Sequence, residues 1–159
     1  MPALFELPLQ VTAADIDPLG HVNNIQYLKW MQSAALAHSA AQGWPHEEYV
    51  RLGAGWVVRS HTIEYLQPAY EGDEIVVLTW VADMKKVTST RRYQMVRFDP
   101  PLADAQGIID PAAPERQTLL AVAHTTWAFI DYKRGTPMRI PAEMAKDFPM
   151  ILDANRIDP

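Results

Sequence analysis

The stretch DIDPLGHVNN, residues 15–24, is the most informative part of this sequence because it directly precedes an apolar segment that is expected to be a helix. It places carboxyl groups, an imidazole and two side-chain amides beside the expected helix start. The first turn of a helix presents unpaired N–H groups and a partial positive charge. An acid or base next to such anion-binding donors is suited to acyl-transfer chemistry. This stretch is therefore the expected functional site.

The helix behind this stretch is expected to run to about Gln42. Asn23 or Asn24 can cap its start, and Gly43 can end it by adopting a left-handed conformation. Its residues are mostly apolar or small. Only a narrow stripe at helical spacing is polar: Gln26, Lys29, Gln32 and Ser33. Such a helix should be largely buried, with its alanines allowing a sheet to approach closely.

Strand patterns lie on both sides of this helix. Residues from about Glu6 to Thr12 fit a first strand. After a loop, four longer candidates follow: Gly55–Tyr65, Glu74–Met84, Thr88–Asp99 and Thr118–Tyr132. The connection Lys85–Val87 is short enough to predict a hairpin. Pro100–Arg116, with four prolines and a glycine, is interpreted as an excursion between strands. A short final helix is expected after Pro141.

These lengths predict long antiparallel strands that curl around one buried helix. A helix of about twenty residues spans about 30 Å, and a strand of about ten residues spans a similar length. One helix cannot cover both faces of a five-stranded sheet, and the sheet edges need protection. We therefore expect a homodimer or a homotetramer built as a dimer of dimers. The alternative is a monomeric α+β sandwich.

Composition limits the possible classes of protein. The 159 residues are 48% hydrophobic and 21% charged, as expected for a single globular domain over residues 1–159. A net charge of −5 argues against nucleic acid or an anionic membrane as partner. The chain has no cysteine, and its first residues do not resemble a secretion signal. We therefore expect a cytoplasmic location.

Motifs for several other chemistries are missing from the sequence. There is no Gly-x-Ser-x-Gly elbow and no Walker-type loop. Residues 46–50, HEEYV, do not fit His-Glu-x-x-His, and the five histidines lack zinc-ligand spacing. We predict neither a metal nor a redox cofactor.

With its signature Asp-x-Asp-x-x-Gly-His-Val-Asn-Asn ahead of the helix, the chain resembles the hotdog-fold acyl-CoA thioesterases of the 4-hydroxybenzoyl-CoA thioesterase type. The resemblance extends over about residues 7–141, and a second matching segment covers residues 64–73. It implies an α+β hotdog fold, in which a long curved antiparallel five-stranded sheet wraps around one central helix. It also implies hydrolysis of an acyl- or aryl-CoA, or of an acyl-carrier protein thioester. The excursion at 100–116 is longer than the family's tight connection.

The family's catalytic carboxylate matches Asp17, and its carbonyl-polarising backbone N–H matches Asn24. Such a donor stabilises the negative charge that develops on the thioester oxygen during attack. The carboxylate would act as general base on water or attack the carbonyl itself to form a mixed anhydride. The structural alternative is that Asp17 is a turn or capping residue before Pro18. Under that alternative the chain could be a non-catalytic acyl-binding or assembly module on the same fold.

Three neighbours of Asp17 are further candidates. His21 could bind the attacking water, orient the acyl group or steady Asp17, or it could instead pack between subunits. Asn23 could line the substrate site, although a cap on the helix would also explain it. Gly20 is expected to serve backbone geometry, through a positive φ or close approach of the thioester.

More distant residues are candidates for holding the rest of the substrate. Lys86 and Arg134 belong to two basic clusters that could attract the phosphates of coenzyme A, which is part of the substrate and not a resident cofactor. Ser89 lies where the family carries small polar residues near the pantetheine. Tyr27 faces the same side of the helix as Trp30 and could line the acyl pocket. The alternatives are that the basic residues only belong to a solvated hairpin tip, and that Tyr27 is packed in an aromatic core.

Overall fold

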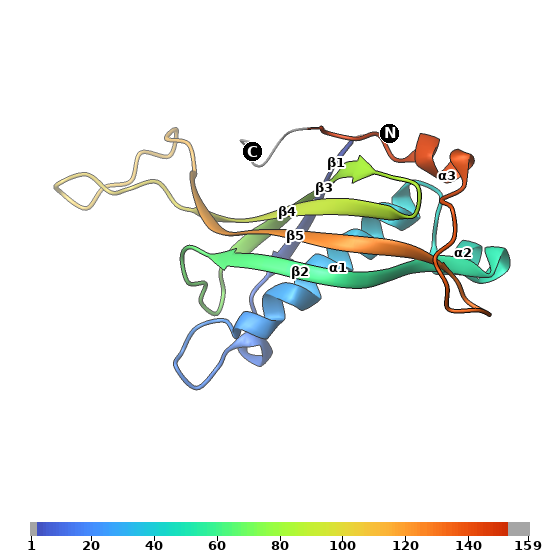
Figure 1. Cartoon of the computed structure of the whole chain (residues 1–159). Coiled ribbons are helices and arrows are strands. Elements are labelled where there is room, and N and C mark those ends of the chain that lie inside the picture. The colour runs from blue at the N-terminus through green and yellow to red at the C-terminus, as the bar shows by residue number, and fades with distance from the viewer. Residues whose placement is uncertain (1–2, 153–159) are drawn as a thin grey trace.

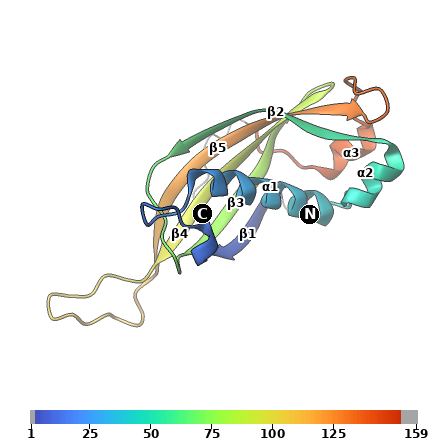
Figure 2. The same cartoon turned by 90° about the horizontal axis from the view of Figure 1, so that it is seen from below.

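The computed structural model describes residues 3–152, which form one five-stranded sheet and three helices. Along the chain the elements are β1 (Leu4–Gln10), a 3-10 turn (Ala13–Asp15), α1 (Asn24–Ala41), α2 (His46–Leu52), β2 (Ala54–Tyr65), β3 (Glu74–Met84), β4 (Thr88–Asp99), β5 (Arg116–Asp131) and α3 (Ala142–Asp147). The strand order is β1-β3-β4-β5-β2, and every neighbouring pair is antiparallel. The sheet curves around α1, which lies along its concave face (Figures 1 and 2).

The main core forms where α1 packs on this concave face. Tyr27, Met31 and Ala34 of α1 are buried against Val77 of β3 and Met95 of β4. Small side chains on this face of the helix let the backbone approach the sheet, as expected from its alanines. The alternation of buried and less buried residues in the outer strand β1 fits a strand with one face on the core.

The strands confirm the pattern-based expectations closely. β3 and β4 have the expected bounds, and they form the expected hairpin across Lys85–Val87. The final helix α3 begins directly after Pro141. Residues 46–52, expected as part of a loop, instead form α2. Pro45 can stand before a helix because it has no N–H to leave unpaired, and Gly53 ends the helix at a φ of 71°.

The expected burial of α1 is correct for one face only. Seven residues of the helix are buried, and most of them pack in the core beneath the helix. Ile25 and Leu36 are exposed on the outer side, together with Lys29 and Gln32 of the polar stripe. A single chain therefore leaves an apolar part of its central helix uncovered.

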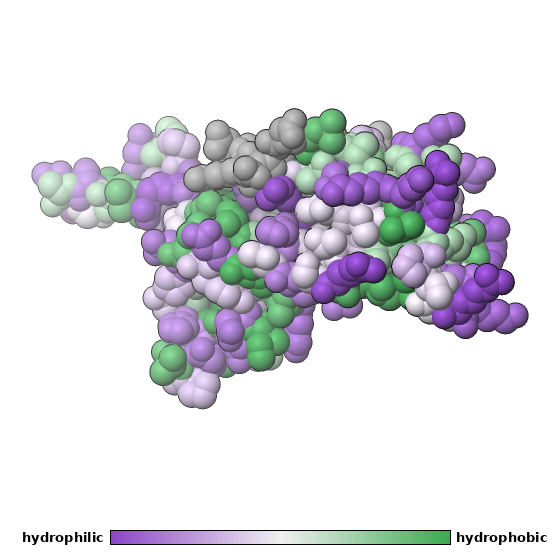
Figure 3. Space-filling model, in the orientation of Figure 1, coloured by the Kyte–Doolittle hydropathy of each residue, from purple (hydrophilic) through white to green (hydrophobic). Residues whose placement is uncertain are grey.

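Two further features remain open to solvent. β2 is an edge strand, and most of its residues are exposed, including Val57 and Val58. Residues 100–115 connect β4 to β5 without any helix or strand and project from one end of the sheet (Figure 1). This segment confirms the expected excursion, and polar and apolar residues are mixed along it (Figure 3).

Candidate active site

The stretch DIDPLGHVNN forms a tight loop in front of α1. Its ends meet at an antiparallel bridge between Ile16 and Val22. The Asp17 N–H donates to the His21 carbonyl at 2.9 Å, and the Gly20 N–H donates to the Asp17 carbonyl at 3.0 Å. Gly20 has a φ of 90°, which confirms the expected positive φ and which other residues rarely adopt. The loop therefore holds Asp17 and His21 in a fixed relation.

The Asp17 carboxylate is held by one oxygen and partly accessible. Oδ1 accepts a hydrogen bond from the Leu19 N–H at 2.8 Å. Oδ2 lies 3.7 Å from Nδ1 of His21, and the two side chains are 19% and 40% exposed, respectively. This is the Asx-turn arrangement of the structural alternative, but it occupies only one of the two oxygens. The other is available to a ligand.

The start of α1 supplies a donor beside this carboxylate. The Asn23 side chain caps the helix by accepting from the Ile25 N–H at 3.0 Å, so its expected capping role is confirmed. Asn24 is the first helical residue, and its N–H has no preceding turn to bond to. Within residues 3–152 this N–H has no acceptor. It is thus free to bind an oxygen atom of a ligand.

One pocket of about 380 Å³ unites four of the predicted site residues. Asp17, His21, Asn24 and Tyr27 line it, together with Val22 and residues 65–68 from the end of β2 and the turn after it. Residues 65–68 are not among the predicted site residues, because their side chains match no catalytic motif. They do lie inside the second segment that resembles the family, residues 64–73.

Two tyrosines form part of the wall of this pocket. The Tyr27 and Tyr65 rings pack edge to face with centroids 5.1 Å apart, and the Tyr65 hydroxyl donates to the Asn24 carbonyl at 2.8 Å. Burial, followed by the neighbouring Tyr65, raises the pKa of Tyr27 to about 12. Tyr27 is therefore a neutral phenol at physiological pH.

Three predicted residues lie away from this pocket in the same chain. Ser89 lies in β4 and lines a different pocket, where its hydroxyl donates to the Asp83 carbonyl at 2.8 Å. Lys86 lies in the turn between β3 and β4, and its carbonyl accepts from the Ile140 N–H. Arg134 is exposed in the turn after β5. Lys86 and Arg134 therefore lie at the opposite end of the sheet from Asp17.

Neither a metal cage nor a membrane-crossing helix is found among the described residues. Nowhere in residues 3–152 do three or more His, Asp or Glu side chains gather as ligands for a metal ion. No helix in this range is long and apolar enough to cross a membrane.

Comparisons with known proteins agree with this fold. The family model described as the thioesterase-like superfamily matches residues 11–148, so the chain belongs to that superfamily. No curated protein matches the chain.

Solved structures support the same assignment of the fold. The chain is similar to 4-hydroxybenzoyl-CoA thioesterase, crystallised as an aspartate-to-asparagine mutant with 4-hydroxybenzoyl-CoA: 17% identity over 93% of this chain and 100% of the other, with a TM-score of 0.76. It is also similar to the 1,4-dihydroxy-2-naphthoyl-CoA thioesterase from Synechocystis, with 19% identity over 91% and 95% of the two chains and a TM-score of 0.71. The expected hotdog fold is thereby confirmed.

Proposed function

We propose that this protein is an acyl-CoA thioesterase that hydrolyses the thioester bond of an acyl- or aryl-CoA, or of an acyl-carrier protein. The observation that carries the proposal is that the Asp17 carboxylate and the first residue of α1 line the same pocket. This pairing supplies a base or nucleophile and a donor for the developing negative charge in one place.

In this mechanism the thioester oxygen accepts a hydrogen bond from the Asn24 N–H. The positive end of the α1 dipole adds to the stabilisation of the charge on that oxygen. In one route Asp17, oriented by the Leu19 N–H, removes a proton from water, which adds to the carbonyl carbon as the coenzyme A thiolate leaves and takes up a proton. In the other route Asp17 attacks the carbonyl carbon itself and displaces the thiolate, and water then hydrolyses the mixed anhydride. His21 faces Asp17 across 3.7 Å, where it can bind the attacking water or steady the carboxylate. The products are the carboxylic acid and free coenzyme A.

Several of the similar structures favour an aromatic acyl group, although a protein described as an oleoyl thioesterase is also among them. The similar structures include thioesterases for 4-hydroxybenzoyl-CoA, 1,4-dihydroxy-2-naphthoyl-CoA and gentisyl-CoA. The two tyrosine rings in the Asp17 pocket offer faces and edges on which an aryl group can pack. Coenzyme A enters as part of the substrate, and the reaction as written consumes no other cofactor.

The proposal includes a homodimer as the active form, or a homotetramer built from such dimers. β2 offers an unpaired edge, and Ile25 and Leu36 leave apolar surface on the outer side of α1. Pairing two β2 edges would satisfy the open backbone groups and cover part of this surface.

A thiol-release assay with aryl-CoA, short-chain and long-chain acyl-CoA substrates tests the activity. We expect Asp17→Asn to lower kcat by at least about a hundredfold, because the amide is neither a base nor a nucleophile. Asp15→Asn is the matched control. The Asp15 carboxylate caps the 3-10 turn by accepting from the Thr12 N–H at 2.9 Å, a role that an amide oxygen can keep.

Two results would count against the enzyme. Full activity in Asp17→Asn would remove this residue from the mechanism. Tight binding of acyl-CoA without any thiol release in the wild type would instead favour the acyl-binding module.

A further inference from the structure

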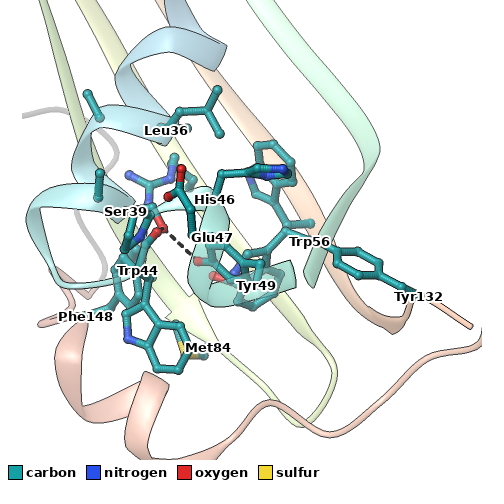
Figure 4. A pocket seen from close by; sticks show the side chains of 18 residues that line it. Leu36, Ser39, Trp44, His46, Glu47, Tyr49, Trp56, Met84, Tyr132 and Phe148 are labelled. Atoms are coloured by element: carbon teal, nitrogen blue, oxygen red, sulfur yellow. Dashed lines mark hydrogen bonds between the residues drawn. The ribbon is translucent and has the colours of Figure 1, made fainter. Parts of the chain in front are cut away.

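A second and larger pocket lies at the other end of α1. It has a volume of about 560 Å³ and is enclosed by the last turns of α1, the segment leading into α2, and the ends of the strands. Six aromatic side chains line it: Trp44, Tyr49, Trp56, Trp127, Tyr132 and Phe148. Figure 4 shows Trp44 and Phe148 on one side and Trp56 and Tyr132 on the other. A pocket of this size suits a small organic molecule.

Arg91 brings a positive charge into this aromatic pocket. It projects from β4, lines the pocket, and is only 7% exposed. Its Nη1 contacts Nδ1 of His38 at 2.8 Å and donates to Oγ1 of Thr79 at 3.2 Å. Neither partner balances its charge. Among residues 3–152, no carboxylate forms an ion pair with Arg91.

The remaining donors of this guanidinium are unused. Within the described part of the chain, Nε and Nη2 of Arg91 have no acceptor. A buried charge without a partner is costly, and burial accordingly lowers the pKa of Arg91. The free-energy cost of burying this guanidinium is much lower when a ligand supplies the missing negative charge. The flat guanidinium fork fits a carboxylate through two parallel hydrogen bonds.

The other ionisable side chains of the pocket lie on its outer side. His46 and Glu47 are in the first turn of α2 and are exposed to solvent, so water screens their charges. Ser39 and Tyr49 bond to each other at 2.7 Å, as the dashed line in Figure 4 shows. Arg91 is therefore the charged group that faces a ligand from the protein interior.

We propose that this pocket binds a small organic carboxylate, whose apolar body packs among the aromatic rings and whose carboxylate pairs with Arg91. This site is distinct from the Asp17 pocket of the same chain. From Asn24 to Ser39 the axis of α1 rises about 22 Å. The inference goes beyond the proposed hydrolysis and holds whether or not Asp17 is catalytic. The carboxylate is either that of a compact free acid or the far end of a longer molecule.

Binding is measured by calorimetry and by the fluorescence of the three tryptophans that line the pocket. The probes are 4-tert-butylbenzoate, its uncharged amide and monomethyl sebacate, at about pH 8, where an ordinary histidine is neutral. We expect the wild type to bind at least one carboxylate about tenfold or more tightly than the amide, as for a charged hydrogen-bonded pair. Preference for the benzoate indicates a compact acid, and preference for the sebacate ester indicates the end of a longer molecule.

Arg91→Gln should remove the preference for the carboxylate and leave the affinity for the amide within about threefold, because only the charged pair is lost. Arg92→Gln is the matched control. It removes the same charge from the neighbouring position of β4, which does not line the pocket, and it should leave both affinities unchanged. Arg91→Lys keeps the charge without the fork and should give an intermediate affinity.

Three results of these binding measurements would overturn the inference. They are no binding of either carboxylate to the wild type, equal affinity for acid and amide, and an unchanged preference in a folded Arg91→Gln. If Arg91→Gln does not fold, the comparison of acid and amide on the wild type decides alone. Displacement of the bound acid by coenzyme A itself would also overturn it, because the pocket would then belong to a phosphate ligand.

Discussion

At the scale of single residues, the loop before α1 divides the work between side chains and backbone. The Leu19 N–H fixes one oxygen of Asp17, and the loop that turns at Gly20, with its positive φ, places Nδ1 of His21 3.7 Å from the other. Asn23 contributes its side chain to the helix cap, whereas Asn24 lines the pocket and is proposed to act through its backbone N–H. Two adjacent asparagines therefore have separable roles.

This division predicts different results for two neighbouring substitutions. Asn23→Ala should lower the free energy of unfolding by about 1 kcal/mol, because it removes the acceptor for the Ile25 N–H. Asn24→Ala should change stability by only a few tenths of a kcal/mol and retain thiol release, because the proposed oxyanion donor is the main-chain N–H. Urea denaturation and steady-state kinetics measure the two effects. Loss of activity in a stable Asn24→Ala would show that its side chain acts on the substrate.

The sequence was sufficient to predict part of the pocket. Asp17, His21, Asn24 and Tyr27 were predictable because they are near in sequence and joined by one loop and one helix face. Tyr65 enters through the return of β2 to the helix start, a contact that depends on how the sheet curves. Arg91 and His38 are 53 residues apart in sequence, and no local sequence pattern predicts a contact between them.

At the scale of elements, β2 forms one edge of the sheet. Among residues 3–152, where β1 forms the opposite edge of the sheet, β2 pairs with β5 on one side and with no strand on the other. Its ladder shifts between Val58 and Ser60, near the middle of the strand. An unprotected edge of twelve residues is a template for pairing with another chain. The proposed dimer gives this edge its partner.

A charge placed on this edge should weaken the dimer. Val58 is 42% exposed, and Val58→Lys sets like charges against each other when two β2 edges meet. We expect the dimer dissociation constant to rise at least about tenfold, as measured by sedimentation equilibrium. Val50→Lys, on the exposed side of α2, is the control and should leave association unchanged. A monomeric wild type, or equal association of both variants, would contradict pairing through β2.

The elements differ in how well the sequence predicts them. β3 and β4 combine dense β-branched and aromatic runs with a short connection, and their bounds follow from that pattern. α2 has only seven residues, and such a short helix has little periodicity. It is stabilised by Tyr49, which packs with Phe129 and Met144 in a second cluster. That support comes from distant parts of the chain and is not visible locally.

At the scale of the whole molecule, the segment 100–115 stands apart from the compact body. Its turns are closed by its own side chains, since Asp104 accepts from the N–H groups of Gln106 and Ile108. At its base, β4 and β5 pair as far as Asp99 and Arg116. The body therefore holds the ends of this segment together without help from its tip.

Shortening this segment should leave the body intact. Replacing residues 101–113 with a short glycine-containing turn should change the free energy of unfolding by less than about 1 kcal/mol, because loop closure depends only weakly on length. The thiol-release activity should remain. Chemical denaturation and the same assay check both expectations. A large loss of stability would show that the tip of the segment supports the fold.

The two pockets at opposite ends of α1 have a consequence for any symmetric assembly. Because β2 runs from the Arg91 end of the molecule to the Asp17 end, a dyad axis across two joined β2 strands reverses one copy relative to the other. The Asp17 end of α1 in each copy then lies beside the Arg91 end of α1 in its partner. In such a pair the two kinds of pocket would lie side by side across the interface, although they lie at opposite ends of each chain.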